Sequence, residues 1–118
     1  MTSMISKMFD LTGRVAVVTG AAQGMGRAMS IALAAAGADL MLVDRNETGA
    51  TETAASIEQM GRRAAVAAID VANPAQIRDL FQRVDAEFGR VDFLGNVAGE
   101  AMLAPPETIS LDVFERDR

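Results

Sequence analysis

Short apolar runs alternate with longer segments of helical periodicity along the chain, and this alternation restricts the fold more than any other feature. Runs typical of buried strands lie at residues 14–19, 39–43, 64–69 and 91–97. Helices are expected between them, at 24–36, 47–60 and 74–88, and a further helix is expected after Ser110. Strands joined through helices pair in parallel, with helices on both faces of the sheet. The sequence therefore predicts an α/β fold with a doubly wound parallel sheet.

The expected helices carry their own end signals and apolar faces. Asn73 and Pro74 form a strong helix start, with asparagine as the N-cap and proline in the first turn. Glycines suited to end a helix follow the three segments at Gly37, Gly61 and Gly89. The residues expected to face the sheet are Met25, Met29, Ala32, Leu33 and Ala36 in the first helix, Ala50, Ala54, Ile57 and Met60 in the second, and Ile77, Leu80, Phe81, Val84 and Phe88 in the third.

Three glycines lie between the first strand and the first helix, in the stretch VVTGAAQGMGRA at 17–28. Considered alone, they are equally consistent with a flexible turn. Their position favours a binding role, because an open parallel sheet binds ligands beyond the carboxyl ends of its strands and a helix N-terminus attracts phosphate. Gly20 would allow a tight turn, Gly24 close approach of a pyrophosphate, and Gly26 close packing of helix on strand. The lysine of a Walker-type loop is absent, which disfavours a nucleoside triphosphatase.

Asp44 follows the second strand and lies 18 residues after Gly26. In a dinucleotide-binding fold this position faces the adenosine ribose, where a carboxylate accepts hydrogen bonds from the hydroxyls and repels a 2′-phosphate. The alternative is a solvated turn aspartate that caps the next helix. The spacing favours the ribose role, and with it NAD over NADP. The neighbouring Arg45 is the reservation, because its guanidinium could receive a phosphate.

The composition excludes several classes of function. The 118 residues include 11 basic and 16 acidic side chains, with a net charge of −5 and no basic stripe, so neither nucleic acid nor membrane is expected as a partner. There is no His, Cys, Tyr or Trp, and Lys7 is the only lysine. A Ser-His-Asp triad, a Cys-His pair and a His-ligated metal are therefore excluded within these residues. The lack of cysteine and of a signal peptide favours the cytoplasm. Residues 1–8 are expected to form a flexible leader before a domain at 9–118.

Four short motifs together resemble those of the short-chain dehydrogenase/reductase family. They are TGAAQGMG at 19–26, Asp44, Asp70-Val71 after the third strand and NVAG at 96–99 after the fourth. The resemblance implies a Rossmann-like domain in which the glycine turn binds the cofactor pyrophosphate and the aspartate after the third strand binds the adenine amino group. It implies that the NVAG turn supports the central strand and the cofactor, although Val97 replaces the family's second asparagine and Gly95 is uncommon. The cofactor-binding residues so expected are Gly20, Ala22, Gln23, Gly24, Met25, Gly26, Asp44, Arg45, Asp70, Val71, Asn96, Ala98 and Gly99.

The family's catalytic residues have no counterpart in this chain. Family members use a serine and a Tyr-x-x-x-Lys pair to move a proton while the nicotinamide cofactor exchanges hydride with an alcohol or carbonyl substrate. Because the chain has no tyrosine, the 118 residues alone are expected to be inactive, and no catalytic residue is assigned.

Three interpretations remain open. The chain is the cofactor-binding half of an NAD-dependent oxidoreductase, a stand-alone nucleotide-binding or regulatory module, or an interaction domain that has lost its ligand. The intact glycines and the aspartates Asp44 and Asp70 disfavour the last. The apolar fourth strand would leave an open edge if no fifth strand paired with it, which favours the first. The resemblance then implies a dimer or tetramer.

Overall fold

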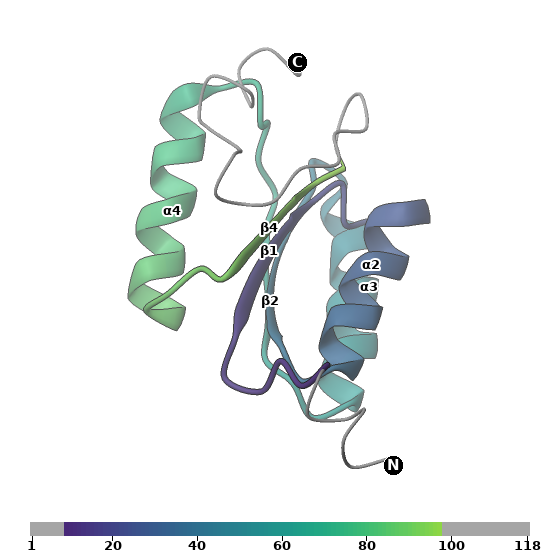
Figure 1. Cartoon of the computed structure of the whole chain (residues 1–118). Helices are drawn as coiled ribbons and strands as arrows, with labels where there is room; N and C mark the ends of the chain where they lie inside the picture. The colour runs from purple at the N-terminus through teal and green to yellow at the C-terminus, as the bar shows by residue number, and fades with distance from the viewer. Residues whose placement is uncertain (1–8, 98–118) are drawn as a thin grey trace, which may run out of the picture.

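The computed structural model describes residues 9–97, in which strands and helices alternate (Figure 1). The strands are β1 (Val15–Thr19), β2 (Asp39–Val43), β3 (Ala64–Ala67) and β4 (Phe93–Asn96). The helices are α2 (Gly24–Ala35), α3 (Glu47–Gln59) and α4 (Pro74–Phe88). The expected leader at 1–8 and the expected helix after Ser110 lie outside the described residues. No helix within residues 9–97 is long and apolar enough to cross a membrane.

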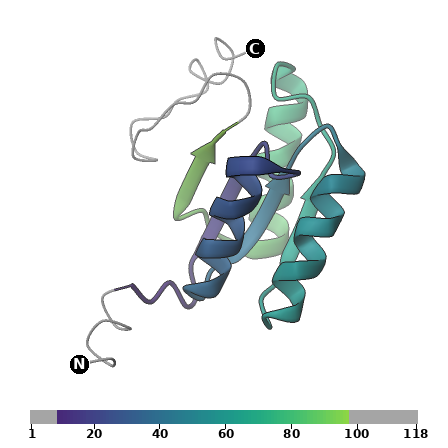
Figure 2. The ribbon, with the colours of Figure 1, turned by 90° about the vertical axis from the view of Figure 1, so that its right-hand side faces the viewer.

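The four strands form one parallel sheet in the order β3-β2-β1-β4. Helices α2 and α3 cover one face and α4 covers the other, as Figures 1 and 2 show. This arrangement confirms the predicted doubly wound α/β fold. Because all strands run in the same direction, the residues that follow them collect at one edge of the sheet, and that edge carries the glycine turn.

The core consists of two layers, one on each face of the sheet. Alternate residues of a strand point to opposite faces, so Val17 and Met41 pack beneath α4 while Val18 and Leu42 pack beneath α2 and α3. All five residues of β1 are buried. The two central strands are therefore continuous apolar runs, as expected for a parallel sheet covered on both sides.

The predicted helix ends are confirmed for α4. The side chain of Asn73 accepts hydrogen bonds from the N–H groups of Ala75 and Gln76, at 3.0 and 3.3 Å, and Pro74 begins the helix. Gly89 ends it in the left-handed conformation, with φ 78°. Gly37 and Gly61 also have positive φ after the helices that precede them.

The buried face predicted for α2 is wrong in part: Met29 and Leu33 are half-buried and pack against the core as predicted, but Met25 and Ala32 are exposed. The buried residues of this helix are Gly26, Ser30 and Ala34, whereas Met25 is 61% exposed. Small residues face the sheet because the beginning of α2 lies directly on the turn that follows β1, and larger side chains flank this narrow contact. Met60 at the end of α3 is also exposed rather than buried. The stripe predicted for α4 is confirmed, with Ile77, Leu80 and Val84 buried.

Strands β3 and β4 are shorter than the apolar runs that predicted them. Residues of β3 pair one by one with β2, and the last pair joins Ala67 to Val43, where β2 ends. Ile69 therefore lies beyond the ladder. In the same way β4 begins at Phe93, opposite Ala16, and Val91 is exposed before it. Within the described residues β4 pairs with β1 alone.

Candidate functional site

The turn between β1 and α2 depends on glycine at three positions. Gly20 and Gly24 have φ of 69° and 57°, in the left-handed region that favours glycine. At Gly26 a Cβ atom would lie 1.9 Å from the carbonyl oxygen of Gly20. The structure thus agrees with a tight turn at Gly20 and close packing at Gly26, and the group packed against Gly26 is the turn's own backbone.

The first turn of α2 is open at its N-terminus. No side chain caps the helix at Gln23, and its first turn contains no acidic residue. Helices α3 and α4 differ, since the asparagines Asn46 and Asn73 cap them. A Cβ built on Gly24 has no heavy atom within 4 Å. Open space therefore adjoins a helix start whose backbone N–H groups and dipole attract an anion.

Asp44 follows β2 and connects to this turn. One carboxylate oxygen accepts a hydrogen bond from the N–H of Ala22 at 3.0 Å, and the other accepts one from the N–H of Asn46 at 2.9 Å. The residue that caps α3 is Asn46, whose side chain accepts from the N–H of Gly49 at 3.0 Å. The alternative role of Asp44 as a helix cap is therefore wrong. Its half-buried carboxylate is held by backbone groups of two neighbouring turns.

A pocket of about 210 Å³ lies at the carboxyl ends of the first three strands. Its lining residues are Gly20, Val43, Asp44, Arg45, Ile69 and Val71. Four of the residues expected to bind a cofactor are among them. The pocket is mostly apolar apart from the Asp44 carboxylate and the exposed guanidinium of Arg45, which suits a flat ring beside a polar group.

Asp70 lies next to this pocket, in the turn between β3 and α4. Its side chain accepts a hydrogen bond from the N–H of Ala72 at 2.9 Å, and its own N–H donates to the side chain of Gln76 at 2.7 Å. Asp70 is half-buried and its neighbours Ile69 and Val71 line the pocket, while Asp70 itself does not. Its expected contact with an adenine amino group stays a prediction.

Asn96 joins the ends of β4 and β1. It is buried, and its side-chain oxygen accepts a hydrogen bond from the Thr19 hydroxyl at 2.8 Å. The N–H of Val97 donates in turn to the Thr19 oxygen at 3.0 Å. These contacts fit a supporting role for the turn after β4. The expected site residues Ala98 and Gly99 lie outside the described residues.

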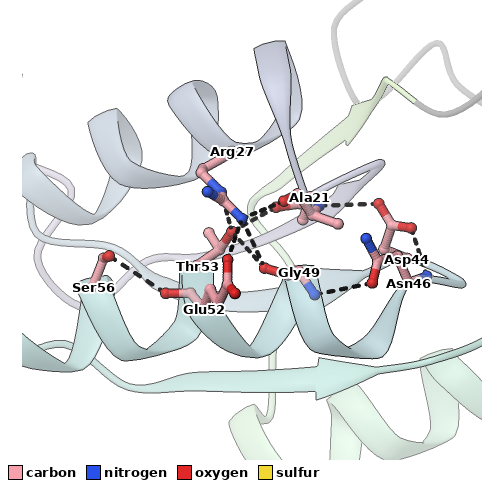
Figure 3. Close-up of polar contacts among 9 residues, drawn as sticks. Ala21, Arg27, Asp44, Asn46, Gly49, Glu52, Thr53 and Ser56 are labelled. Carbon is pink, nitrogen blue, oxygen red and sulfur yellow. Dashed lines mark hydrogen bonds and ion pairs between the residues drawn. The ribbon is translucent and has the colours of Figure 1, made fainter.

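Three residues that hold the glycine turn were missed by reasoning from sequence. Arg27, Gly49 and Thr53 connect the turn to α3, as Figure 3 shows. A Cβ at Gly49 would lie 2.8 Å from the Cβ of Ala22, so this glycine lets the turn approach the helix. The available signal was a glycine inside a segment of helical periodicity. Glycine is unfavourable within a helix, so its presence there indicates a position where close packing leaves no room for a side chain.

Comparison with known proteins extends this picture. The family model described as short chain dehydrogenase matches residues 14–116. The chain belongs to the short-chain dehydrogenase family. The match includes the glycine turn and the ends of all four strands, so it agrees with the fold and with the resemblance described above.

Individual members of the family are similar to this chain in sequence and in structure. A D-threitol dehydrogenase of Mycolicibacterium smegmatis is 48% identical over 109 residues, which are 91% of this chain and 41% of that protein. The NAD-bound structure of a short chain dehydrogenase from Mycobacterium paratuberculosis is 32% identical, with a TM-score of 0.74 over 92% of this chain and 44% of that one. L-Sorbose reductase from Gluconobacter frateurii, complexed with NADPH and L-sorbose, is 33% identical, with a TM-score of 0.74 over 86% and 39%. The chain thus spans about two fifths of the length of these relatives.

Proposed function

We propose that this chain is the NAD-binding portion of a short-chain oxidoreductase that exchanges hydride between a nicotinamide cofactor and an alcohol or carbonyl substrate. The observation that carries the proposal is the hydrogen bond between Asp44 and the N–H of Ala22. This hydrogen bond brings a carboxylate at the end of β2 against the glycine turn at the end of β1. A dinucleotide-binding sheet needs both groups, the turn for the pyrophosphate and the carboxylate for the ribose.

The described residues fit a dinucleotide. Open space beside Gly24 leaves room for a pyrophosphate at the uncapped start of α2. The pocket beside Asp44 offers apolar walls from Val43, Ile69 and Val71 for an adenosine group. A carboxylate has about four lone-pair sites, and Asp44 uses two of them on backbone N–H groups. Acceptor capacity therefore remains for ribose hydroxyls.

The same carboxylate supports a preference for NAD over NADP. A 2′-phosphate at the ribose would place negative charge against Asp44, which two backbone contacts keep from turning away. Arg45 is exposed beside the pocket and is the residue that would oppose this preference. Of the two solved relatives described above, one is bound to NAD and the other to NADPH, so membership of the family alone does not decide between the two cofactors.

The residues of this chain are proposed to bind and orient the cofactor without catalysing turnover. When bound, the nicotinamide donates or accepts the hydride. The glycine turn would hold the pyrophosphate, Asp44 the ribose and Asp70 the adenine, and Asn96 would support the strand ends. Proton transfer would fall to residues outside these 118, since they include no tyrosine and no lysine other than Lys7. We further infer a homo-oligomer, dimer or tetramer, as the assembly of the whole enzyme.

Calorimetric titration of the protein with NAD and NADP tests the proposal. Saturable binding of NAD, tighter than that of NADP, is expected, and no binding of either would contradict it. A preparation containing only these 118 residues should show no turnover with alcohols or ketones. The second candidate, a nucleotide-binding or regulatory module, predicts the same binding but no turnover from the protein as expressed in its source cells.

A further inference from the structure

One peptide group in the glycine turn is held at both ends by side chains from other elements. The carbonyl of Ala21 accepts a hydrogen bond from the Thr53 hydroxyl at 2.8 Å. The N–H of Ala22, which belongs to the same peptide group, donates to the Asp44 carboxylate at 3.0 Å. The plane of this peptide therefore determines where Asp44 finds its donor, and Thr53 on α3 holds the opposite end of the same peptide.

The side chain of Arg27 holds the Thr53 hydroxyl in place. Its Nε donates to the Thr53 oxygen at 2.9 Å. The Thr53 hydroxyl has a single hydrogen, which it can donate to one carbonyl at a time. The carbonyl of Ala21 is the nearer acceptor, at 2.8 Å, and that of Gly49 is farther, at 3.2 Å. Arg27 also donates through Nη2 to the carbonyl of Ala22 at 2.5 Å. Figure 3 shows this chain of contacts running from Arg27 through Thr53 and the turn to Asp44.

Thr53 lies outside the pocket that it influences. It is fully buried on the face of α3 that meets the turn, and it is not among the residues that line the pocket. Hydrogen bonds in such a chain polarise one another, so losing one donor weakens the next. The exposed ion pair of Arg27 with Glu52, at 3.3 Å, adds little by comparison.

We infer that Thr53, supported by Arg27, is a positioning residue for Asp44 and thereby sets the preference between NAD and NADP. The inference rests on the proposed function and extends it to two residues that are not among those lining the pocket. Without the Thr53 hydroxyl the Ala21 carbonyl loses its partner, the peptide rotates more freely, and the carboxylate is no longer fixed against a 2′-phosphate.

The test compares dissociation constants for NAD and NADP in the same protein. Thr53→Val removes the hydroxyl while keeping the shape of the side chain, and it should narrow the ratio of the two affinities about fivefold, the contribution of one hydrogen bond. Thr53→Ser restores the hydroxyl and should restore the ratio. Ser56→Ala is the matched control, because Ser56 lies on the same helix and its hydroxyl bonds only to the carbonyl of Glu52 among the described residues. Arg27→Met should narrow the ratio in the same direction, and it replaces Thr53→Val if that variant does not fold.

A double-mutant cycle with Asp44→Ala separates positioning from general damage. In the Asp44→Ala background, Thr53→Val should leave the ratio unchanged, because the group that it positions is gone. An unchanged ratio in Thr53→Val alone, or an equal narrowing in both backgrounds, would overturn the inference.

Amide hydrogen exchange in the free protein gives a second readout. Thr53→Val should speed exchange at Ala22 while leaving the Ile77 amide of α4, which bonds to the Asn73 carbonyl, as slow as before. A wild-type chain that binds neither dinucleotide contradicts the proposed function. The positioning of Asp44 is still decided in that case, because exchange at Ala22 rises if the inference is right and stays unchanged if it is wrong.

Discussion

The carboxylate of Asp44 and the backbone N–H of Ala22 are joined by a 3.0 Å hydrogen bond across the carboxyl ends of β1 and β2. The contact links two residues 22 positions apart in sequence, and it makes the carboxylate part of the glycine turn. Whatever binds over the turn at this point meets a fixed negative charge. Charge and turn geometry are therefore coupled in this site, and substitutions at Asp44 test both.

Replacing Asp44 should change the cofactor preference. Asp44→Ala removes the charge and the ribose acceptor, and it should shift the free-energy difference between NAD and NADP binding by about 1–3 kcal/mol toward NADP. Asp44→Asn is the closest variant in shape. It removes the charge and keeps one acceptor oxygen, so one of the two backbone N–H groups that Asp44 binds, of Ala22 or Asn46, loses its acceptor. Titration of both dinucleotides measures the shift. Equal affinities in the unmutated protein would mean that Asp44 does not contact the ribose.

Gly26→Ala should destabilise the fold. The added Cβ would meet the carbonyl oxygen of Gly20 at 1.9 Å and its carbon at 2.5 Å, and both atoms belong to backbone. Overpacking of this kind typically costs about 1–3 kcal/mol, and a backbone clash belongs at the upper end of that range. Chemical unfolding measures the loss. An unfolding free energy within about 0.5 kcal/mol of wild type, the usual range of surface substitutions, would show that α2 moves away at little cost.

The sequence was sufficient for the elements and for the position of the glycine turn, because those depend on local signals. Asn73 caps α4 and Gly89 ends it as expected, since capping and left-handed φ are properties of a few neighbouring residues. The buried face of α2 was missed because it is made of small residues that fit beneath the turn, while its larger apolar side chains flank the contact. Arg27 and Thr53 were missed for a related reason. Their partners lie on other elements and become neighbours only in the folded chain.

The stability of the protein should fall at low pH partly through Asp92. This residue precedes β4 at the amino ends of the strands, away from the glycine turn. A 2.6 Å hydrogen bond from Arg90 is the main reason that the pKa of Asp92 lies below its ordinary value. Burial opposes it as the second-largest effect, and the N–H of Val15 and the guanidinium of Arg14 add smaller lowering effects.

The sign of the effect follows from this lowered pKa. The contribution of Asp92 is fully present above the unfolded pKa of about 3.9, and it is lost as pH falls through the folded value below it. Unfolding of wild type and Asp92→Asn at several pH values should show a difference at pH 7 that shrinks in strong acid. A difference independent of pH would contradict this assignment.

Asn73→Ala should destabilise α4 without affecting the site. The substitution leaves the N–H groups of Ala75 and Gln76 without their side-chain acceptor, and loss of an N-cap typically costs about 1 kcal/mol. Asn73→Asp keeps the acceptor and should retain most of the stability. Thermal unfolding of the two variants measures the difference, and equal losses would show that the cap is not the cause.

Gly24→Ala addresses whether the glycine turn exists for binding or only for turning. The φ of Gly24 is 57°, so alanine there incurs backbone strain of about 1–2 kcal/mol. A simple loss of ligand at unchanged stability is therefore not expected. No protein atom lies within 4 Å of the added methyl group, so the methyl group itself should not clash with the protein. A loss of NAD affinity beyond the effect of backbone strain would therefore come from a clash between the methyl group and the bound ligand. NAD affinity should drop steeply if the pyrophosphate lies against this backbone.

Gly61→Ala supplies the control for that strain. Gly61 also has a positive φ, 83°, and open space at its Cβ, and it lies after α3 at the other end of that helix from the turn. Both variants should lose similar stability, while only Gly24→Ala should lose NAD. Gly24→Asn completes the set, because asparagine tolerates the left-handed conformation better and still places a side chain in the open space. If Gly24→Asn and Gly24→Ala both fail to bind NAD, close approach of the ligand is the reason for glycine. If both bind it as wild type does, the turn has no role in binding and the proposed function loses its main structural support.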